Sequence, residues 1–164
     1  MAFEAKDYPI GDILNKSVFE IPRNQRRYVW KKEHWRDLYE DITFSITEHK
    51  PHFVGSIVLE GVRKQEGLSY YTIIDGQQRL TTITIVLLAI MKHFHENDMK
   101  DDFLGTVSYL QSKDNSNRDV IILNSEYHVS ISRMIRNMIA LEDKNLSISS
   151  FVETNLLSKA KDKC

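Results

Sequence analysis

Hydrophobic residues change their spacing along the chain, and each pattern predicts a different element. Residues 10–14 are expected to form a short helix. Residues 18–21 should form a strand that ends at Pro22, because proline has no N–H to donate to a neighbouring strand. An amphipathic helix is predicted from Lys31 and should end near Pro51, with a sheet or another helix covering its apolar stripe. The stripe consists of Trp35, Leu38, Tyr39, Ile42 and Ile46.

The middle of the chain predicts a β-hairpin followed by a buried helix. Residues 53–62 and 69–74 are rich in β-branched and aromatic residues, and the polar, glycine-containing stretch between them predicts a loose loop. Residues 80–94 are apolar on nearly every side, which is typical of a helix packed inside a domain. The sequence IIDGQQRLTT, at residues 73–82, joins the second strand to this helix.

The pattern is less regular in the last third of the chain. Residues 96–102 are interpreted as a charged turn or helix end, and residues 112–119 as a polar loop. A strand is expected at residues 120–123 and a helix with one apolar face from about residue 126 to residue 141. Residues 149–159 are expected to form a final helix.

Composition changes this picture little. A chain of 164 residues with 41% hydrophobic and 27% charged residues is typical of one soluble globular domain, and its net charge of -1 gives no global reason to expect nucleic acid. The single cysteine, Cys164, cannot form an internal disulfide, which favours a cytoplasmic location. The start of the chain does not resemble a secretory signal, and the longest apolar run, residues 83–91, is shorter than the roughly 20 residues that cross a bilayer. No membrane span is expected.

The DGQQR stretch has the residue types of an anion site at a helix start. The first turn of a helix has about four N–H groups without an intrahelical partner, and Gly76 permits a close approach of the backbone to a ligand. Arg79 could bind phosphate through two N–H groups, and Asp75 could bind Mg²⁺ or act as a general base for water. Gln77 and Gln78 could hydrogen-bond a base, a phosphate or that water.

A purely structural interpretation of the same stretch is favoured by the residue types alone. In it, Asp75 and Gly76 make a turn, Gln78 caps the helix, and Arg79 pairs with a surface carboxylate. The chain contains no G-x-x-x-x-G-K-[ST] sequence, so any nucleotide site here is of another kind than a P-loop.

A basic, aromatic segment at residues 23–36 is the second candidate. It holds six basic residues against one acid, a charge of about +5. Tyr28, Trp30 and Trp35 lie among these charges, and aromatic rings beside arginines can stack a base while the cations hold its phosphates. The alternative is that Trp35 belongs to the helical stripe and Lys32 is only solvated. The six basic residues are Arg23, Arg26, Arg27, Lys31, Lys32 and Arg36.

Two further features carry less weight. His93 and His95 stand two residues apart, which places them on different sides of a helix, so a surface pair is favoured over a metal site. Gly55 and Ser56, within the expected strand, fit a close approach to a ligand, a bulge or a packing glycine.

Three motifs in this order, IP-x-x-QR-x-Y-x-W, HFVGSIVL and IIDGQQRLTT, closely resemble the N-terminal domain of GmrSD-type modification-dependent restriction endonucleases. The resemblance is strong over residues 8–94 and extends to about residue 141. It implies an α/β (α+β) fold. Residues 1–98 would form a ParB/sulfiredoxin-like core with a small mixed sheet flanked by helices, and residues 99–164 a mainly helical extension.

The family resemblance implies a function in prokaryotic defence against phage DNA with modified bases or backbones. The DGQQR motif would bind and hydrolyse a nucleoside triphosphate, often GTP, with Mg²⁺. The domain would sense and regulate, while a His-Asn-His nuclease domain on the same chain or a partner chain cuts DNA. A non-catalytic DNA-binding module of such a system, and a unit that only docks onto a nuclease partner, are the alternatives. A homo-oligomer is kept open.

The implied roles fall on positions that match the motifs. The catalytic candidates are Asp75, Gln78 and Arg79, with Asp75 also the metal ligand. The nucleotide-binding candidates are Gly76, Gln77, Gln25, Arg26, Tyr28 and Trp30. The nucleic-acid candidates are Arg23, Arg27 and Lys31. Two features depart from the family: Asn24 replaces the usual aromatic residue, and no nuclease segment precedes Cys164, which implies a fragment or a short member that works with a partner.

Overall fold

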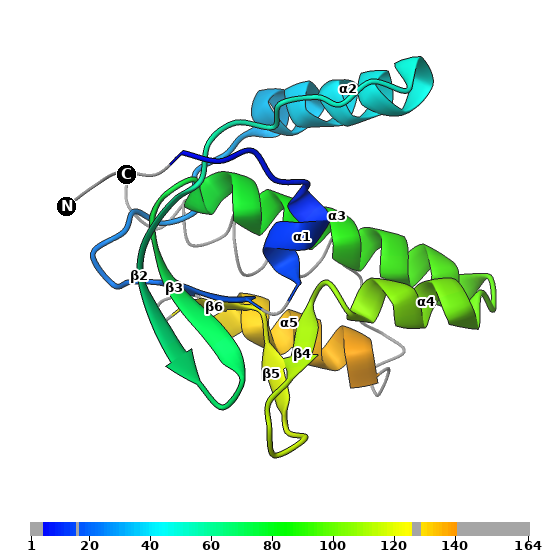
Figure 1. The fold of residues 1–164 in the computed structure, drawn as a ribbon. Coiled ribbons are helices and arrows are strands. Elements are labelled where there is room, and N and C mark those ends of the chain that lie inside the picture. The colour runs from blue at the N-terminus through cyan, green and yellow to red at the C-terminus, as the bar shows by residue number, and fades with distance from the viewer. Residues whose placement is uncertain (1–4, 16, 126–128, 141–164) are drawn as a thin grey trace, which may run out of the picture.

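The computed structural model describes residues 5–15, 17–125 and 129–140, which form a mixed α/β fold (Figure 1). The helices are α1 (Ile10–Leu14), α2 (Lys32–Glu48), α3 (Gln77–Glu96), α4 (Lys100–Val107) and α5 (Val129–Ala140). The strands are β1 (Ser17–Ile21), β2 (Val58–Gln65), β3 (Leu68–Asp75), β4 (Gln111–Lys113), β5 (Asp119–Ile121) and β6 (Leu123–Ser125).

The main sheet has the strand order β2-β3-β1-β6. Strand β1 runs parallel to both of its neighbours, β3 and β6, whereas β2 and β3 are antiparallel. Central position explains why Val18 and Phe19 of β1 are both 0% exposed. The expected α/β class with a small mixed sheet is confirmed, and the ParB/sulfiredoxin-like assignment stays a prediction with which this fold is compatible.

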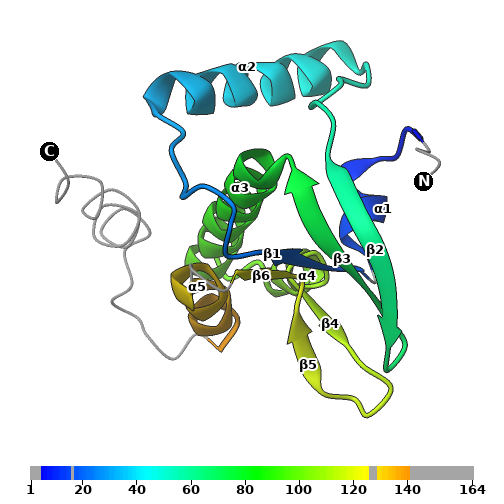
Figure 2. The ribbon, with the colours of Figure 1, turned by 90° about the vertical axis from the view of Figure 1, so that its left-hand side faces the viewer.

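The core lies between the sheet and the helices α3 and α5, which the ribbon shows beside it (Figure 2). Leu88 of α3 packs in one cluster with Phe19 of β1, Ile73 of β3, and Met134 and Ile135 of α5. Burying a large apolar side chain contributes about 1.5–3 kcal/mol, so this cluster is the main source of stability. Strand β6 and helix α5, from the last third of the chain, are part of the same sheet and core.

The β2–β3 hairpin differs from its expected form. Residues 53–57 are not a strand; β2 starts at Val58 and continues through the predicted loop to Gln65. The turn consists of Glu66 and Gly67, which both have positive φ, as the tight turns of twisted hairpins require. A register shift between Glu60 and Val62, with Gly61 between them at a φ of +60°, forms a bulge in this edge strand.

Two other expectations need correction. Helix α3 begins at Gln77 rather than at residue 80, so the glutamines and Arg79 belong to its first turn. The strand expected at residues 120–123 is two strands in different sheets, β5 and β6, separated at Ile122. Helix α4 and strand β4 were not predicted. The helix expected at residues 149–159 lies outside the described residues.

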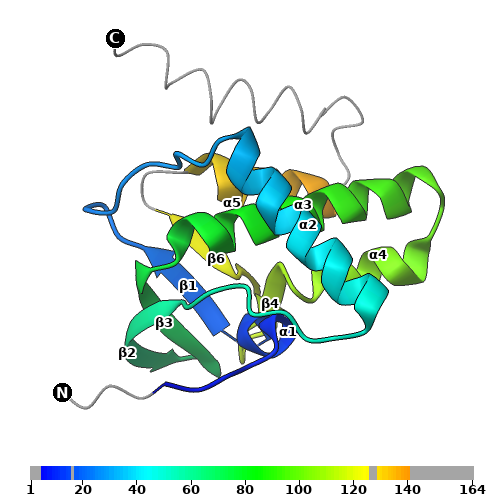
Figure 3. The same cartoon turned by 90° about the horizontal axis from the view of Figure 1, so that it is seen from above.

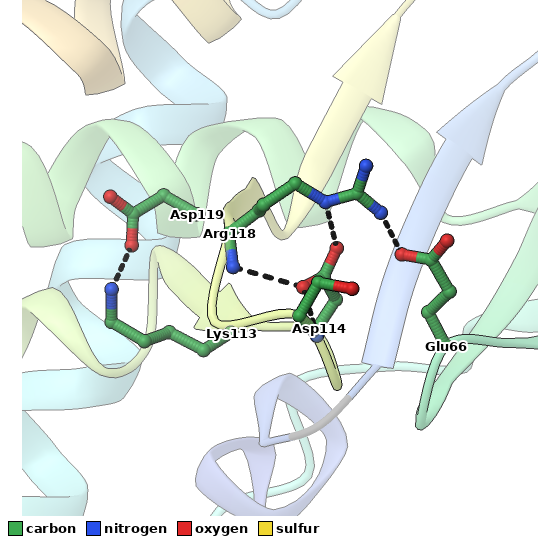
Figure 4. Close-up of polar contacts among 6 residues, drawn as sticks. Glu66, Lys113, Asp114, Arg118 and Asp119 are labelled. Atoms are coloured by element: carbon green, nitrogen blue, oxygen red, sulfur yellow. Dashed lines mark hydrogen bonds and ion pairs between the residues drawn. The ribbon is translucent and has the colours of Figure 1, made fainter.

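The β4–β5 hairpin docks onto the β2–β3 turn through a charged cluster (Figure 4). The Asp114 carboxylate accepts the backbone N–H groups of Ser116 and Arg118 at 2.8 and 2.9 Å and the Arg118 Nε–H at 2.8 Å. These bonds, the backbone one from Arg118 first, lower the pKa of Asp114 to about 2. Arg118 also pairs with Glu66, whose carbonyl accepts the Asn115 N–H at 2.8 Å.

Helix α2 has the predicted bounds but only part of the predicted cover. It stands apart from the rest of the domain, joined to it by two extended segments (Figure 2). Within its stripe only Leu38 is buried, while Tyr39 is 70% and Ile46 67% exposed. Trp35 and Ile42 are half-buried, so within the described part of the chain the expected cover of this stripe is only partial. None of the described helices combines the length and apolarity needed to cross a membrane.

Candidate functional site

The DGQQR stretch forms the start of α3. Strand β3 ends at Asp75, and Gly76 is the N-cap, with a φ of +90° and no hydrogen-bonding side chain. A Cβ on Gly76 would lie 3.0 Å from the Ser56 carbonyl oxygen and 3.1 Å from the Ile57 Cα. Both the backbone conformation and the close neighbour therefore favour glycine. The positive end of the helix dipole lies at this turn, and no side chain of the N-cap residue bonds its N–H groups.

The two glutamines bind the segment that leads from β1 to α2, which we term the first stem (residues 22–31). Gln77 Nε2 donates to the Arg26 carbonyl at 2.7 Å, and Gln78 Nε2 to the Arg27 carbonyl at 3.0 Å. Gln78 Oε1 accepts the Val29 N–H at 2.8 Å. Each glutamine is only 6% exposed, so these bonds satisfy polar groups that water does not reach. The structural interpretation expected Gln78 to cap the helix, and this is wrong, because neither glutamine side chain caps it.

Gln25 and Tyr28 fasten the same stem from its own side. Gln25 Nε2 donates to the Ile74 carbonyl at 2.8 Å, at the end of β3. The Tyr28 hydroxyl shares a hydrogen bond of 2.7 Å with Thr82 Oγ1 in α3. Burial raises the pKa of Tyr28 to about 12, although the bond to Thr82 acts in the opposite direction. Every residue from 25 to 29 is thus tied to the end of β3 or to α3.

Arg79 binds the segment that leads from α2 to β2, which we term the second stem (residues 49–57). Its Nη1 donates to the Ser56 carbonyl at 2.7 Å. Gly55 has a φ of +100°, and a Cβ there would lie 2.5 Å from the Arg79 Cζ. Gly55 is therefore a packing glycine that makes room for the guanidinium group. Within the described residues, Arg79 pairs with no carboxylate, in contrast to the structural interpretation.

Three charged side chains at this junction point into solvent. Asp75, Arg26 and Arg27 are exposed, and within the part of the chain that the structure describes their side chains have no hydrogen bond or ion pair. The backbone of both arginines is nevertheless held on the first turn of α3 by Gln77 and Gln78. Two cations and one carboxylate thus originate at one uncapped helix start.

The remaining candidates lie where the first stem meets α2. Trp30 stacks on His34, with ring centroids 5.7 Å apart and an interplanar angle of 20°. His34 Nδ1 accepts the Lys31 N–H at 3.2 Å and so helps to cap α2. Arg23 and Lys31 are exposed. Trp35 packs edge-on against Tyr28, at 6.3 Å between centroids, as its assignment to the helical stripe expects.

The structure thus brings Gln25, Arg26, Tyr28 and residues 75–79 together, and sets Trp30 and Lys31 farther along the stem. The individual roles in catalysis, nucleotide binding and metal binding stay predictions. Within the described residues, no group of three or more His, Cys, Asp or Glu side chains could hold a metal ion. Sequence reasoning missed the contribution of Thr82 and His34; a hydroxyl inside an otherwise apolar helix was the only available signal for the former.

The model of the family described as the GmrSD restriction endonuclease N-terminal domain matches residues 10–163, a range that contains both stems and the whole of α3. The search of curated proteins found no match.

Proposed function

This chain belongs to the family of GmrSD restriction endonuclease N-terminal domains, and from that premise we propose that it is a nucleotide-binding regulatory domain of a prokaryotic anti-phage restriction system. Its ligand is a nucleoside triphosphate with Mg²⁺, which the domain hydrolyses. Its partners are DNA and a His-Asn-His nuclease domain, on the same or another chain, that makes the cut.

One observation carries the nucleotide proposal: exposed groups of both signs converge on an uncapped helix start. Asp75 directly precedes the turn, and the carbonyls of Arg26 and Arg27 are bonded to its first two residues. A helix N-terminus with nearby guanidinium groups favours phosphate, and an exposed carboxylate favours the Mg²⁺ that accompanies a triphosphate.

The hydrogen bonds at this site distinguish side chains that are available to a ligand from side chains that already bind a stem. Arg26 and Arg27 bind the phosphates, and Asp75 binds Mg²⁺ or orients the attacking water. Bound Mg²⁺ supplies charge neutralisation at the phosphates. Gln77, Gln78 and Arg79 are already engaged with the stems, so a direct part in the chemistry would first require those bonds to open. Trp30, stacked on His34, has the aromatic character to pack against a base.

The test measures nucleotide binding and phosphate release together. GTP, ATP and CTP are titrated with Mg²⁺ against the wild type, Asp75→Ala, and an Arg26→Ala/Arg27→Ala double variant. We expect the double variant to lose binding and Asp75→Ala to lose Mg²⁺-dependent phosphate release. Matched controls remove charges elsewhere: Asp101→Ala on α4 and Arg63→Ala on β2 should behave as the wild type. Equal binding and turnover in all five proteins would refute the proposal.

A second function, nucleotide-independent DNA binding, is supported by the basic segment. All six basic residues between residues 23 and 36 are exposed, along the first stem and the start of α2. Phosphate contacts release counterions, so the affinity for duplex DNA should fall steeply with salt. If DNA binding without nucleotide is lost in the Arg26→Ala/Arg27→Ala variant while no nucleotide binds to the wild type, this second function replaces the first.

A further inference from the structure

We propose that residues 76–79 anchor an exposed arm, formed by α2 and its two stems, and so set the position of that arm. The proposal goes beyond nucleotide binding and does not depend on it. It concerns what the first turn of α3 does in the protein without any ligand.

Both ends of the arm are held by the same four consecutive residues. Gln77 and Gln78 bind the first stem through the carbonyls of Arg26 and Arg27. Arg79 binds the second stem through the Ser56 carbonyl, with Gly76 packed against the same segment. The stems are far apart in sequence and descend to the domain separately (Figure 2). One helical turn is therefore the point where they meet.

Within the described part of the chain, few other side chains hold α2 to the domain. Leu38 is its one buried residue, and the half-buried Trp35 packs against Tyr28 of the first stem and against the core cluster. His52 of the second stem lies 3.3 Å from the Asp41 carboxylate of α2 (Nε2 to Oδ2), so this stem is tied to the helix that it follows. The view from above shows α2 crossing over α3 as a separate layer (Figure 3).

A change at residues 76–79 should therefore change the position of α2. Loss of one anchor removes hydrogen bonds to the main chain of its stem. Within the described residues, few other contacts fix the direction of α2, chiefly those of Leu38 and Trp35. Because the two stems share one turn, any ligand at that turn acts on both. The anchor residues are thus positioning residues for the exposed arm, whatever chemistry takes place beside them.

The experiment measures the distance between α2 and α3 in the complete chain. Cys164→Ser removes the native thiol, and nitroxide labels are attached through Thr43→Cys and Ala89→Cys, two exposed positions on these helices. Double electron–electron resonance then gives the distance distribution. We expect one narrow peak in this background, since both stems are held.

The anchor variants are Gln78→Ala and Arg79→Ala, and the matched control is Thr84→Val, which removes a buried hydroxyl bonded within α3 to the Leu80 carbonyl. The anchor variants should lose the narrow peak in favour of a broad, shifted distribution, and the control should keep it. Hydrogen exchange at the Val29 amide should accelerate in Gln78→Ala, which verifies that the bond is gone.

Two results would overturn the proposal. One is an unchanged distribution in both anchor variants although the Val29 amide exchanges faster. The other is equal broadening in Thr84→Val, which would mean that any loss of a buried polar contact in α3 frees the helix. If Gln78→Ala fails to fold, Gln78→Glu serves instead, because it keeps the acceptor for Val29 and loses only the donor to Arg27.

Discussion

A methyl group at Gly76 should destabilise the domain more than one at Gly61, which also has positive φ. Gly76→Ala forces alanine into a φ of +90° and directs its Cβ against two backbone atoms, the Ser56 oxygen at 3.0 Å and the Ile57 Cα at 3.1 Å. Backbone atoms cannot move aside as the end of a flexible side chain can. The second stem must therefore shift away from the start of α3.

Two other glycines separate the cost of the backbone conformation from the cost of the steric overlap. Gly61 also has positive φ, at +60°, but a Cβ there meets nothing within 4 Å. Gly61→Ala should therefore cost only the backbone term, about 1–2 kcal/mol. Gly76→Ala adds overpacking, which typically costs about 1–3 kcal/mol more. Gly105, helical and unobstructed in α4, should instead gain about 0.5–1 kcal/mol of stability on change to alanine.

Equilibrium urea unfolding, followed by circular dichroism, measures all three variants against the wild type. The predicted order of stability is Gly105→Ala, wild type, Gly61→Ala, Gly76→Ala. In a domain of this size, each kcal/mol shifts the melting temperature by about 2–4 °C. The reasoning fails if Gly76→Ala is no less stable than Gly61→Ala, because the close approach of the second stem would then contribute nothing.

Two pH-dependent predictions follow from Tyr28 and Asp114. The raised pKa of Tyr28 means that its protonated form stabilises the fold fully below about pH 10, and that this stability is lost as the pH rises towards 12; Tyr28→Phe should flatten the alkaline part of the melting profile. The lowered pKa of Asp114 means that its ionised form stabilises the fold above its ordinary value of 3.8, and that this is lost as the pH falls towards 2. Asp114→Asn should lower the melting temperature at pH 7, and the difference from the wild type should shrink between pH 4 and pH 2. A difference constant with pH would contradict either assignment.

Most of the elements that periodicity predicted well have side chains that face the core; α2, with much of its apolar stripe exposed, is the exception. Helix α3 is rich in apolar residues, and Leu80, Ile85, Leu88 and Met91 among them are buried. Strand β3 buries Leu68 and Ile73. Strand β2 was misplaced because most of its side chains are exposed and polar, so only its hydrogen bonds to β3 make it a strand. Helix α4 was missed because just two of its residues, Phe103 and Thr106, are buried. Buried positions require apolar residues and can be recognised in the sequence. The backbone hydrogen bonds of an edge strand can be made by any residue type except proline, so they cannot be recognised in this way.

The site was predicted as a set of residues but not as a set of contacts. Family resemblance grouped Gln25, Arg26 and Tyr28 with the DGQQR motif, and the structure brings them together. The partners of Gln77 and Gln78 could not be predicted, because both bind carbonyls 51 positions away in the sequence and any residue type offers a carbonyl. The cover of the α2 stripe could not be predicted for a related reason. Amphipathicity shows that a helix has an apolar face, but not what covers that face.

Because the motif holds the arm as well as facing the proposed ligand, loss of activity has different meanings at its different positions. Gln77 and Gln78 hold the first stem, so their substitution disturbs the placement of Arg26 and Arg27 before any chemistry is affected. Gly76 and Arg79 touch the second stem, so their substitution disturbs the other end of the arm. If Gln78→Ala loses phosphate release, the cause could be either the loss of a catalytic group or the loss of the hydrogen bonds that hold the first stem. Asp75 differs, because its exposed side chain holds neither stem. Asp75→Ala should therefore keep the narrow α2–α3 distance while abolishing Mg²⁺-dependent turnover, and that combination separates the chemistry of the site from the position of the arm.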